Sequence, residues 1–231
     1  MTVCLEVSGA EVARPFVDKA QAEHPSLIDT AHEMDAKFGV NNIPSGIWID
    51  ERGTVVRPAE PAWPGPAPQP PARAEVQLDA TQQHVRHLVA DRIISHRERY
   101  ANAVLDWANK GAASRFALSP EEVIARSQPR PPEVPLAAAH FELAQHLWSA
   151  NMRDAAIAHF RQAHRLQPDN WTYKRQAWSL ISVETQAGPR ARLRQWPAEG
   201  QETAWPFESD FARDLERLPS GDYYPDTMAG D

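Results

Sequence analysis

Residues 58–71 read PAEPAWPGPAPQPP, with proline at every second or third position. Proline has no backbone N–H and its ring fixes φ, so this stretch suits neither a helix nor a central strand. It is typical of an extended, semi-stiff spacer in the polyproline II conformation. We therefore predict an interdomain linker at residues 58–75; docking of the stretch on an aromatic-lined groove is the alternative.

The composition limits the classes of function. The 231 residues have a formal net charge of −7, which argues against binding to nucleic acid or to an anionic membrane. No apolar run approaches the ~18 residues that cross a bilayer, and the first residues lack the pattern of a signal peptide. The single cysteine, Cys4, excludes an intrachain disulfide, a dithiol motif and a cysteine-rich zinc site. We expect a cytoplasmic protein.

The part before the linker alternates short strands and helices. Alternating apolar residues predict a strand at residues 2–7, and Thr30 and Gly39 are suited to cap the two ends of a helix at 31–38. The predicted order is strand 2–7, helix 11–23, strand 26–29, helix 31–38, and a hairpin with strands 46–50 and 54–57.

This order, with the phrases VCLEVSGAEVARPFVDKA, HPSLID and KFGVNNIPSGIWIDERGTVV, resembles the C-terminal portion of thioredoxin-like redoxins of the TlpA/ResA and AhpC/TSA type. The resemblance covers about the first quarter of the chain. It implies an incomplete thioredoxin-like α/β domain at residues 1–57. It also implies that the proline at position 44 is cis and that its loop lines a substrate groove: Asn42, Ile43, Pro44 and Ser45.

The resemblance also implies a redox residue that these residues lack. In the family, a strand and a helix that precede the matched part hold a CxxC motif or a peroxidatic cysteine. Cys4 instead falls within a predicted strand, where nothing lowers its pKa, so we interpret it as a core residue. Either the redoxin part is noncatalytic, or the chain extends upstream of Met1 through an active site. Selenocysteine, whose UGA codon can be misread as a stop, is one version of the second hypothesis.

The part after the linker is predicted to be a helical domain at residues 76–187. Residues 76–109 form an amphipathic helix with one break, and Ser119, Pro120 and Glu122 make a capping box for the next helix. Residues 137–170 resemble one tetratricopeptide repeat (TPR), stacked against a helix at 171–185. The matching positions are Leu143, Ala144, Leu147, Ala156, Phe160, Ala163 and Pro168.

The TPR resemblance implies a concave binding face. That face would expose Phe141, Gln145 and Trp148 unless a flanking helix covers them. The aromatic, proline-rich tail at 188–231 is expected to pack back on a domain, with a short helix at 210–218 capped by Ser209.

The nine histidines do not form a metal-binding motif. His84 and His87 are three apart and His159 and His164 five apart, but no third ligand is placed with either pair. No catalytic residue, metal or cofactor is therefore predicted.

The sequence predicts an α+β protein. Its predicted function is that of a noncatalytic protein-interaction module derived from a thiol or selenol redoxin, with partners bound through the TPR region. The alternative is a thiol-disulfide oxidoreductase or peroxidase whose redox residue lies upstream. Half of a thioredoxin-like sheet leaves the strand at 2–7 with an unpaired edge, which a second copy could cover in a homodimer.

Overall fold

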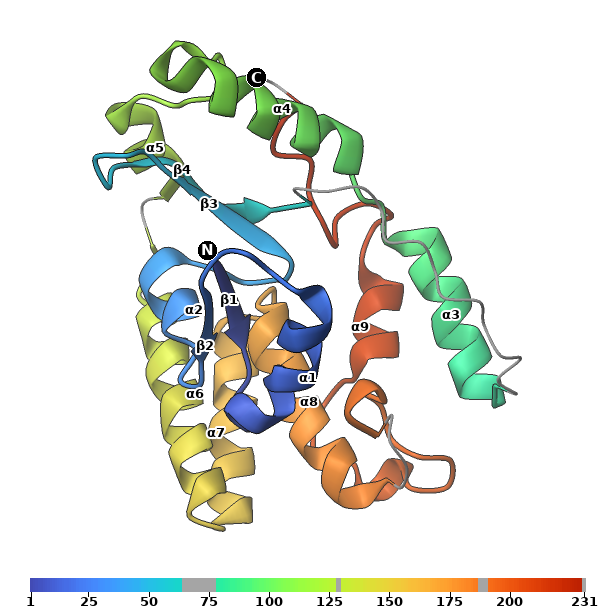
Figure 1. Cartoon of the computed structure of the whole chain (residues 1–231). Helices are drawn as coiled ribbons and strands as arrows, with labels where there is room; N and C mark the ends of the chain where they lie inside the picture. Colours follow the sequence, from blue (N-terminus) through green and yellow to red (C-terminus); the bar gives the residue numbers. More distant parts are fainter. Residues whose placement is uncertain (64–77, 128–129, 187–190, 230–231) are drawn as a thin grey trace. The chain divides into compact units, whose positions relative to one another are not determined.

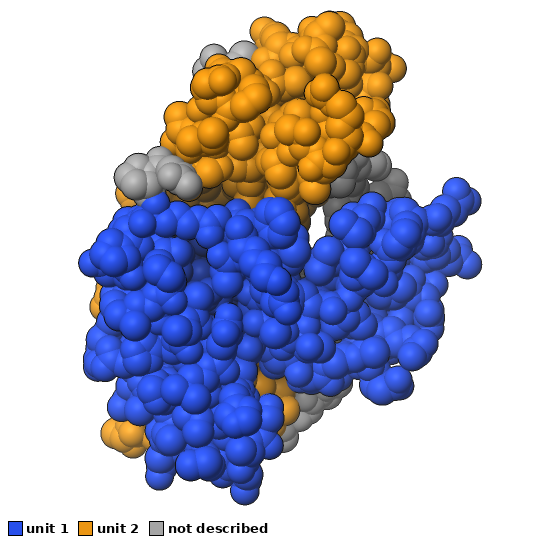
Figure 2. Space-filling model, turned by 90° about the vertical axis from the view of Figure 1, so that its left-hand side faces the viewer, with its two compact units in different colours: residues 1–41, 130–174 blue, residues 42–129, 175–231 orange. Residues whose placement is uncertain are grey.

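The computed structural model describes residues 1–63, 78–127, 130–186 and 191–229, and its fold is α+β, as predicted. The chain divides into two compact units (Figure 2). Unit 1 consists of residues 1–41 and 130–174, and unit 2 of residues 42–129 and 175–231. Each unit is built from two separate stretches of chain, so the units group residues differently from the predicted domains at 1–57 and 76–187.

Unit 1 begins with a parallel strand pair. Strands β1 (Thr2–Leu5) and β2 (Ser26–Asp29) are joined through helix α1 (Ala10–Ala20), and helix α2 (Glu33–Phe38) follows. Thr2 is paired with Ser26 and Leu5 with Asp29. A crossover helix between parallel strands is the usual βαβ connection. The predicted element order is confirmed here, with β1 ending two residues earlier than expected.

The N-terminus of α2 corrects one prediction. The N-cap position is His32, and the side chain of Asp29, not that of Thr30, binds the free N–H groups: its carboxylate accepts hydrogen bonds from the N–H groups of Glu33 at 3.0 Å and Met34 at 2.9 Å. A charged carboxylate near these N–H groups is also favoured by the helix dipole. At the other end, Gly39 adopts a left-handed conformation with φ of 75°, as predicted.

The second stretch of unit 1 is a helical hairpin formed by α6 (Glu133–Ser149) and α7 (Arg153–Leu166), visible in Figure 1. Helix α8 (Trp171–Thr185) follows, at the residues predicted. The alanines at the predicted TPR positions are fully buried, which lets the two helices approach closely. They are Ala144, Ala156 and Ala163. Leu143 was expected to fill the same interface but is 41% exposed, because it lies on the outer face of α6.

Unit 2 contains an antiparallel hairpin of β3 (Ser45–Ile49) and β4 (Val55–Pro61). Strand β4 runs into the predicted linker, and Trp63 beyond it is 5% exposed and packs on Tyr224. Prolines are tolerated in β4 because a two-stranded sheet consists only of edge strands. The linker prediction is therefore wrong for residues 58–63, and its residues 64–75 lie outside the described part of the chain.

The helices of unit 2 confirm the predicted break. The helix predicted at residues 76–109 is divided into α3 (Ala80–Arg92) and α4 (Arg97–Lys110). A short 3-10 helix, η1 (Gly111–Ala113), then precedes α5 (Pro120–Ser127). The capping box of α5 is present: Ser119 N–H donates to Glu122 at 2.8 Å and Glu122 N–H to Ser119 Oγ at 3.2 Å. The core beside the hairpin is made by Trp48, Ala62, Tyr100, Ala103, Phe116 and Met228.

The C-terminal tail packs within unit 2, as predicted. After η2 (Ala191–Leu193) and η3 (Glu202–Ala204), helix α9 (Phe211–Arg217) packs against α3. Asp210 rather than Ser209 caps α9, since its side chain accepts the Arg213 N–H at 3.0 Å. The buried residues of the tail include Trp205, Phe207, Phe211, Leu215, Tyr223 and Tyr224.

The strand pairings differ from what the redoxin resemblance implies. Within the described residues, β1 pairs with β2 and β3 with β4, which gives two sheets of two strands instead of one incomplete sheet. No helix of the described residues is long and apolar enough to cross a membrane.

Candidate functional site

The loop predicted to line a substrate groove is held by backbone and side-chain contacts within unit 2. Asn42 is buried and donates from Nδ2 to the Tyr223 carbonyl at 2.9 Å, while Tyr224 donates its hydroxyl to the Ile43 carbonyl at 2.7 Å. Ser45 Oγ donates to the Glu60 carbonyl at 3.0 Å. The Ile43–Pro44 peptide bond is cis. Only Ile43 and Pro44 remain exposed in this loop.

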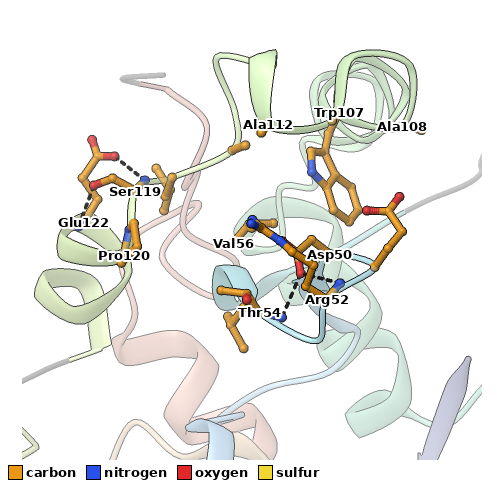
Figure 3. A pocket seen from close by; sticks show the side chains of 15 residues that line it. Asp50, Arg52, Thr54, Val56, Trp107, Ala108, Ala112, Ser119, Pro120 and Glu122 are labelled. Carbon is orange, nitrogen blue, oxygen red and sulfur yellow. Dashed lines mark hydrogen bonds and ion pairs between the residues drawn. The ribbon is translucent and has the colours of Figure 1, made fainter.

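A pocket of about 970 Å³ lies elsewhere in unit 2 (Figure 3). One side is the turn between β3 and β4, where Asp50, Arg52 and Thr54 lie. Another is Trp107 with Ala108 at the end of α4, and the third is the start of α5. The volume falls within the range of small-molecule sites. None of the residues 42–45 lines this pocket.

Local sequence explains the shape of the turn. Asp50 Oδ1 accepts the N–H groups of Arg52 at 3.0 Å and Thr54 at 2.9 Å, and Oδ2 binds the Arg52 guanidinium at 3.0 Å. These bonds, that from Thr54 first, lower the pKa of the Asp50 carboxyl. Asp50 is therefore ionised but already satisfied, and it acts as a turn residue.

Trp107 provides the aromatic side of the pocket. Its ring stacks on Trp48 with centroids 5.0 Å apart at an angle of 25°, and Trp48 donates from Nε1 to the Tyr100 hydroxyl at 2.9 Å. The Arg57 guanidinium lies 5.4 Å from the Trp48 ring centre. Because Trp48 is buried in the core, this stack fixes the position of the half-buried Trp107.

The predicted TPR face is not open. Phe141 is fully buried, stacked on Tyr173 at 4.2 Å and packed edge-on against His32 at 5.0 Å. Gln145 and Trp148 are half-buried, and the Arg153 guanidinium lies 4.0 Å from the Trp148 ring centre. The expectation that Phe141 lines a binding face is therefore wrong; elements of unit 1 cover it, which was the alternative.

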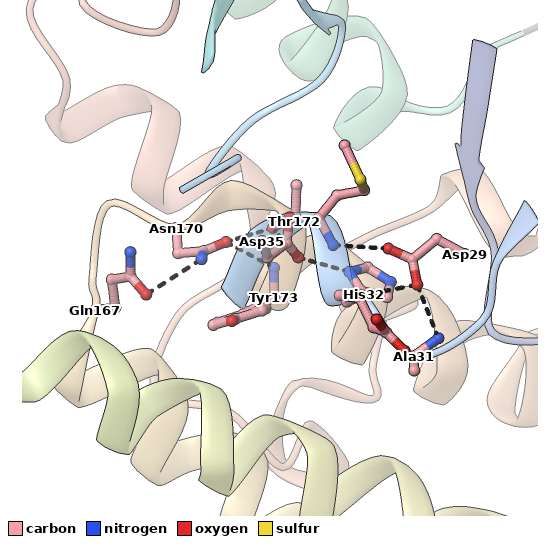
Figure 4. Close-up of polar contacts among 10 residues, drawn as sticks. Asp29, Ala31, His32, Asp35, Gln167, Asn170, Thr172 and Tyr173 are labelled. Carbon is pink, nitrogen blue, oxygen red and sulfur yellow. Dashed lines mark hydrogen bonds and ion pairs between the residues drawn. The ribbon is translucent and has the colours of Figure 1, made fainter. Parts of the chain in front are cut away.

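A buried polar cluster lies beside Phe141 in unit 1 (Figure 4). His32 Nδ1 is 2.7 Å from Asp35 Oδ2, and Thr172 donates its hydroxyl to the same oxygen at 2.9 Å. Thr172 also contacts Asn170 Oδ1, although its hydroxyl has a single proton to share between the two acceptors. Burial raises the pKa of Asp35, which the bonds from His32 and Thr172 only partly oppose.

The His32–Asp35 pair is like the pair that activates a nucleophile in hydrolases, but its geometry does not permit that role. His32 is 3% exposed, and its Nε2 atom is buried without a partner among the described residues. A general base must reach the proton that it removes, directly or through one water. The cluster therefore joins α2 to the start of α8, and no sequence motif indicated it.

We expect Asp35→Asn to stabilise the protein increasingly as the pH rises from 4 to 7, relative to the parent. Because the folded-state pKa of Asp35 is raised, its contribution to stability is complete below the unfolded carboxyl pKa of about 4. That contribution is lost as the pH rises through the folded-state pKa of Asp35, whereas asparagine remains neutral at every pH. Urea unfolding at several pH values measures the difference.

Asp50→Asn is the matched control with the opposite sign. The folded-state pKa of Asp50 is lowered, so its contribution is present above about pH 4 and lost on acidification. This variant should become more destabilised toward pH 7. A pH-independent difference between Asp35→Asn and the parent would contradict the expectation.

The remaining candidate residues do not assemble a centre. His84 Nε2 pairs with Glu216 Oε1 at 2.7 Å, and His140 and His159 place their Nδ1 atoms 2.8 Å apart across the α6–α7 hairpin. In residues 1–63, 78–127, 130–186 and 191–229, no three His, Cys, Asp or Glu side chains are grouped as metal ligands.

Cys4 lies in β1, as predicted, and is partly buried. Burial, and then the charge of Glu6, raise the pKa of its thiol.

No family profile, no curated protein and no solved structure matches this chain.

Proposed function

We propose that this chain is a noncatalytic protein-interaction module, related to thiol or selenol redoxins through residues 1–57 and to TPR proteins through residues 137–170. The pocket between the β3–β4 turn, α4 and α5 is the observation on which the interaction rests. It replaces the TPR face as the proposed binding surface, because Phe141 is buried. Among the described residues β1 pairs with β2 alone, and its other side is a second surface, proposed for a second copy of the chain.

The interaction is tested by crosslinking in the protein's own cells. A photoreactive phenylalanine analogue at Ala112, which lines the pocket, should form a discrete adduct with a partner protein. The same analogue at Ala204, an exposed alanine of η3 outside the pocket, is the matched control. Absence of adducts at Ala112, or identical adducts at both positions, would contradict an interaction through this pocket.

The noncatalytic part of the proposal is supported by the raised pKa of the Cys4 thiol. Since the thiolate is the reactive form, iodoacetamide at pH 8 should alkylate Cys4 more slowly in the folded protein than in the same protein unfolded in urea. Glu6→Gln should increase the folded-state rate, because it removes the neighbouring charge. A folded-state rate equal to or above the unfolded-state rate would contradict the proposal.

The second candidate is a thiol-disulfide oxidoreductase or peroxidase whose redox residue lies outside these 231 residues. It is favoured by the order β1–α1–β2–α2–β3–β4, which agrees with the order expected from the resemblance. The intact mass of the protein from its own cells distinguishes the two candidates. A heavier product that contains an additional cysteine or selenocysteine peptide would favour the oxidoreductase.

A further inference from the structure

The charges around the pocket are unbalanced. Three carboxylates and one guanidinium line it: Asp50, Glu51, Glu122 and Arg52. Asp50 and Arg52 form an ion pair with each other, at 3.0 Å. Glu51 and Glu122 have no ion-pair partner in the part of the chain that the structure describes; Glu122 accepts only the Ser119 N–H. Two uncompensated negative charges therefore remain at the pocket, one from the turn and one from α5.

The aromatic side of the pocket suits a cation as well. One face of Trp107 is occupied by Trp48, and the residue itself remains half-buried at the pocket. Tryptophan is the side chain that binds cations most strongly over its ring. A cationic group placed on Trp107 would be near the turn that carries Glu51, whereas Glu122 lies across the pocket from Trp107 (Figure 3).

Exposed apolar side chains continue from the pocket along both helices. Leu105 precedes the pocket residue Ala108 by three positions on α4, and Ile124 follows Pro120 by four positions on α5. Residues at these spacings share a helix face. Both Leu105 and Ile124 are 60% exposed. This apolar surface favours a peptide segment with apolar residues beside the cation over a small free amine.

We propose that the pocket binds an arginine or lysine side chain of a partner protein, in a segment whose neighbouring residues are apolar. The proposal rests on the proposed interaction function and names the class of partner. The cation lies against Trp107 and pairs with Glu51, while Glu122 adds negative charge across the pocket. The apolar neighbours contact Leu105 or Ile124. The negative charge of the pocket also attracts a basic segment before contact.

Capped tripeptides test the proposal with the full-length chain. Acetyl-Leu-Arg-Leu-amide is titrated against the ¹⁵N-labelled protein, and the indole N–H signal of Trp107 is followed after assignment with Trp107→Phe. The expected result is a saturable shift of this signal that weakens as salt is added. The same peptide with citrulline, which is nearly isosteric but uncharged, should bind about tenfold more weakly.

Charge variants locate the site. Glu51→Gln should weaken binding of the arginine peptide about three- to fivefold, and Glu122→Gln, which acts from across the pocket, should weaken it less. Glutamine at 122 can still accept the Ser119 N–H, so the cap of α5 is kept. Glu121→Gln makes the same charge change on the same helix outside the pocket, and it should leave affinity unchanged.

Three results would overturn the proposal. The citrulline peptide could bind as tightly as the arginine peptide, Glu121→Gln could weaken binding as much as Glu51→Gln, or the Trp107 signal could remain unmoved at millimolar peptide. If adducts still form from Ala112 in cells, the interaction function stands and only the basic partner is excluded. If neither peptides nor adducts are seen, both proposals fail.

Discussion

Arg57→Met is expected to lower the free energy of unfolding of unit 2 by about 3–5 kcal/mol, because it leaves a buried carboxylate without its partner. Arg57 is fully buried and binds Glu60 through two parallel bonds, Nε to Oε1 at 2.8 Å and Nη2 to Oε2 at 3.0 Å. Its Nη1 also donates to the Phe116 carbonyl at 2.9 Å and its Nη2 to the Thr227 carbonyl at 3.3 Å. One side chain thus joins three separate segments of the unit.

Chemical denaturation, followed by tryptophan fluorescence, measures this loss. Arg52→Met is the matched control in the same hairpin: the Arg52 side chain is 80% exposed and solvent screens its ion pair with Asp50, so the loss should be much smaller. The double variant Arg57→Met, Glu60→Gln should recover part of the loss, because the unpaired charge is removed. A loss in Arg57→Met as small as that in Arg52→Met would contradict the buried position of Arg57.

Phe141→Ala should cost about 3–5 kcal/mol in unit 1, the usual cost of removing a buried aromatic ring. Phe141 is fully buried between Tyr173, Phe160 and His32. Leu143→Ala, two residues further along α6, removes a side chain that is 41% exposed and should cost much less. Thermal and urea unfolding of the two variants provide the comparison.

This experiment also decides between the two interpretations of the TPR face. If Phe141 lined an open binding surface, Phe141→Ala would leave stability unchanged and affect only partner binding. A cost of less than about 1 kcal/mol would therefore restore the open face as a candidate and contradict the packing described for unit 1.

The sequence predicted features that depend on near neighbours. The capping box of Ser119 and Glu122, the left-handed Gly39 and the helix at 171–185 are all present. For two helices the predicted capping side chain was wrong by one residue. In each case a hydroxyl residue was expected, and the adjacent aspartate accepts the hydrogen bonds instead. Asp29 and Asp210 supply the capping carboxylates where Thr30 and Ser209 were expected, because the strand or turn before the helix decides which side chain reaches the free N–H groups.

Features that depend on distant contacts could not be predicted. The residues that line the pocket are drawn from three segments, within 50–56, 107–112 and 117–122, and no local pattern connects these segments. Composition assigned residues 58–63 to the linker because proline-rich chain is usually extended. Arg57 and Glu60 instead form a buried pair there, and Trp63 packs on Tyr224. Likewise, the helical periodicity of α6 does not show which of its faces unit 1 covers.

The discontinuous composition of the two units affects how the protein is made. Residues 1–41 leave the ribosome before residues 130–174, and unit 1 needs both stretches to complete its core, so strands β1 and β2 must wait until residue 174 has been synthesised. Unit 2 likewise joins residues 42–129 to 175–231. Any cut in the proline-rich stretch would separate parts of unit 2, so expression of either half alone should yield a poorly folded fragment.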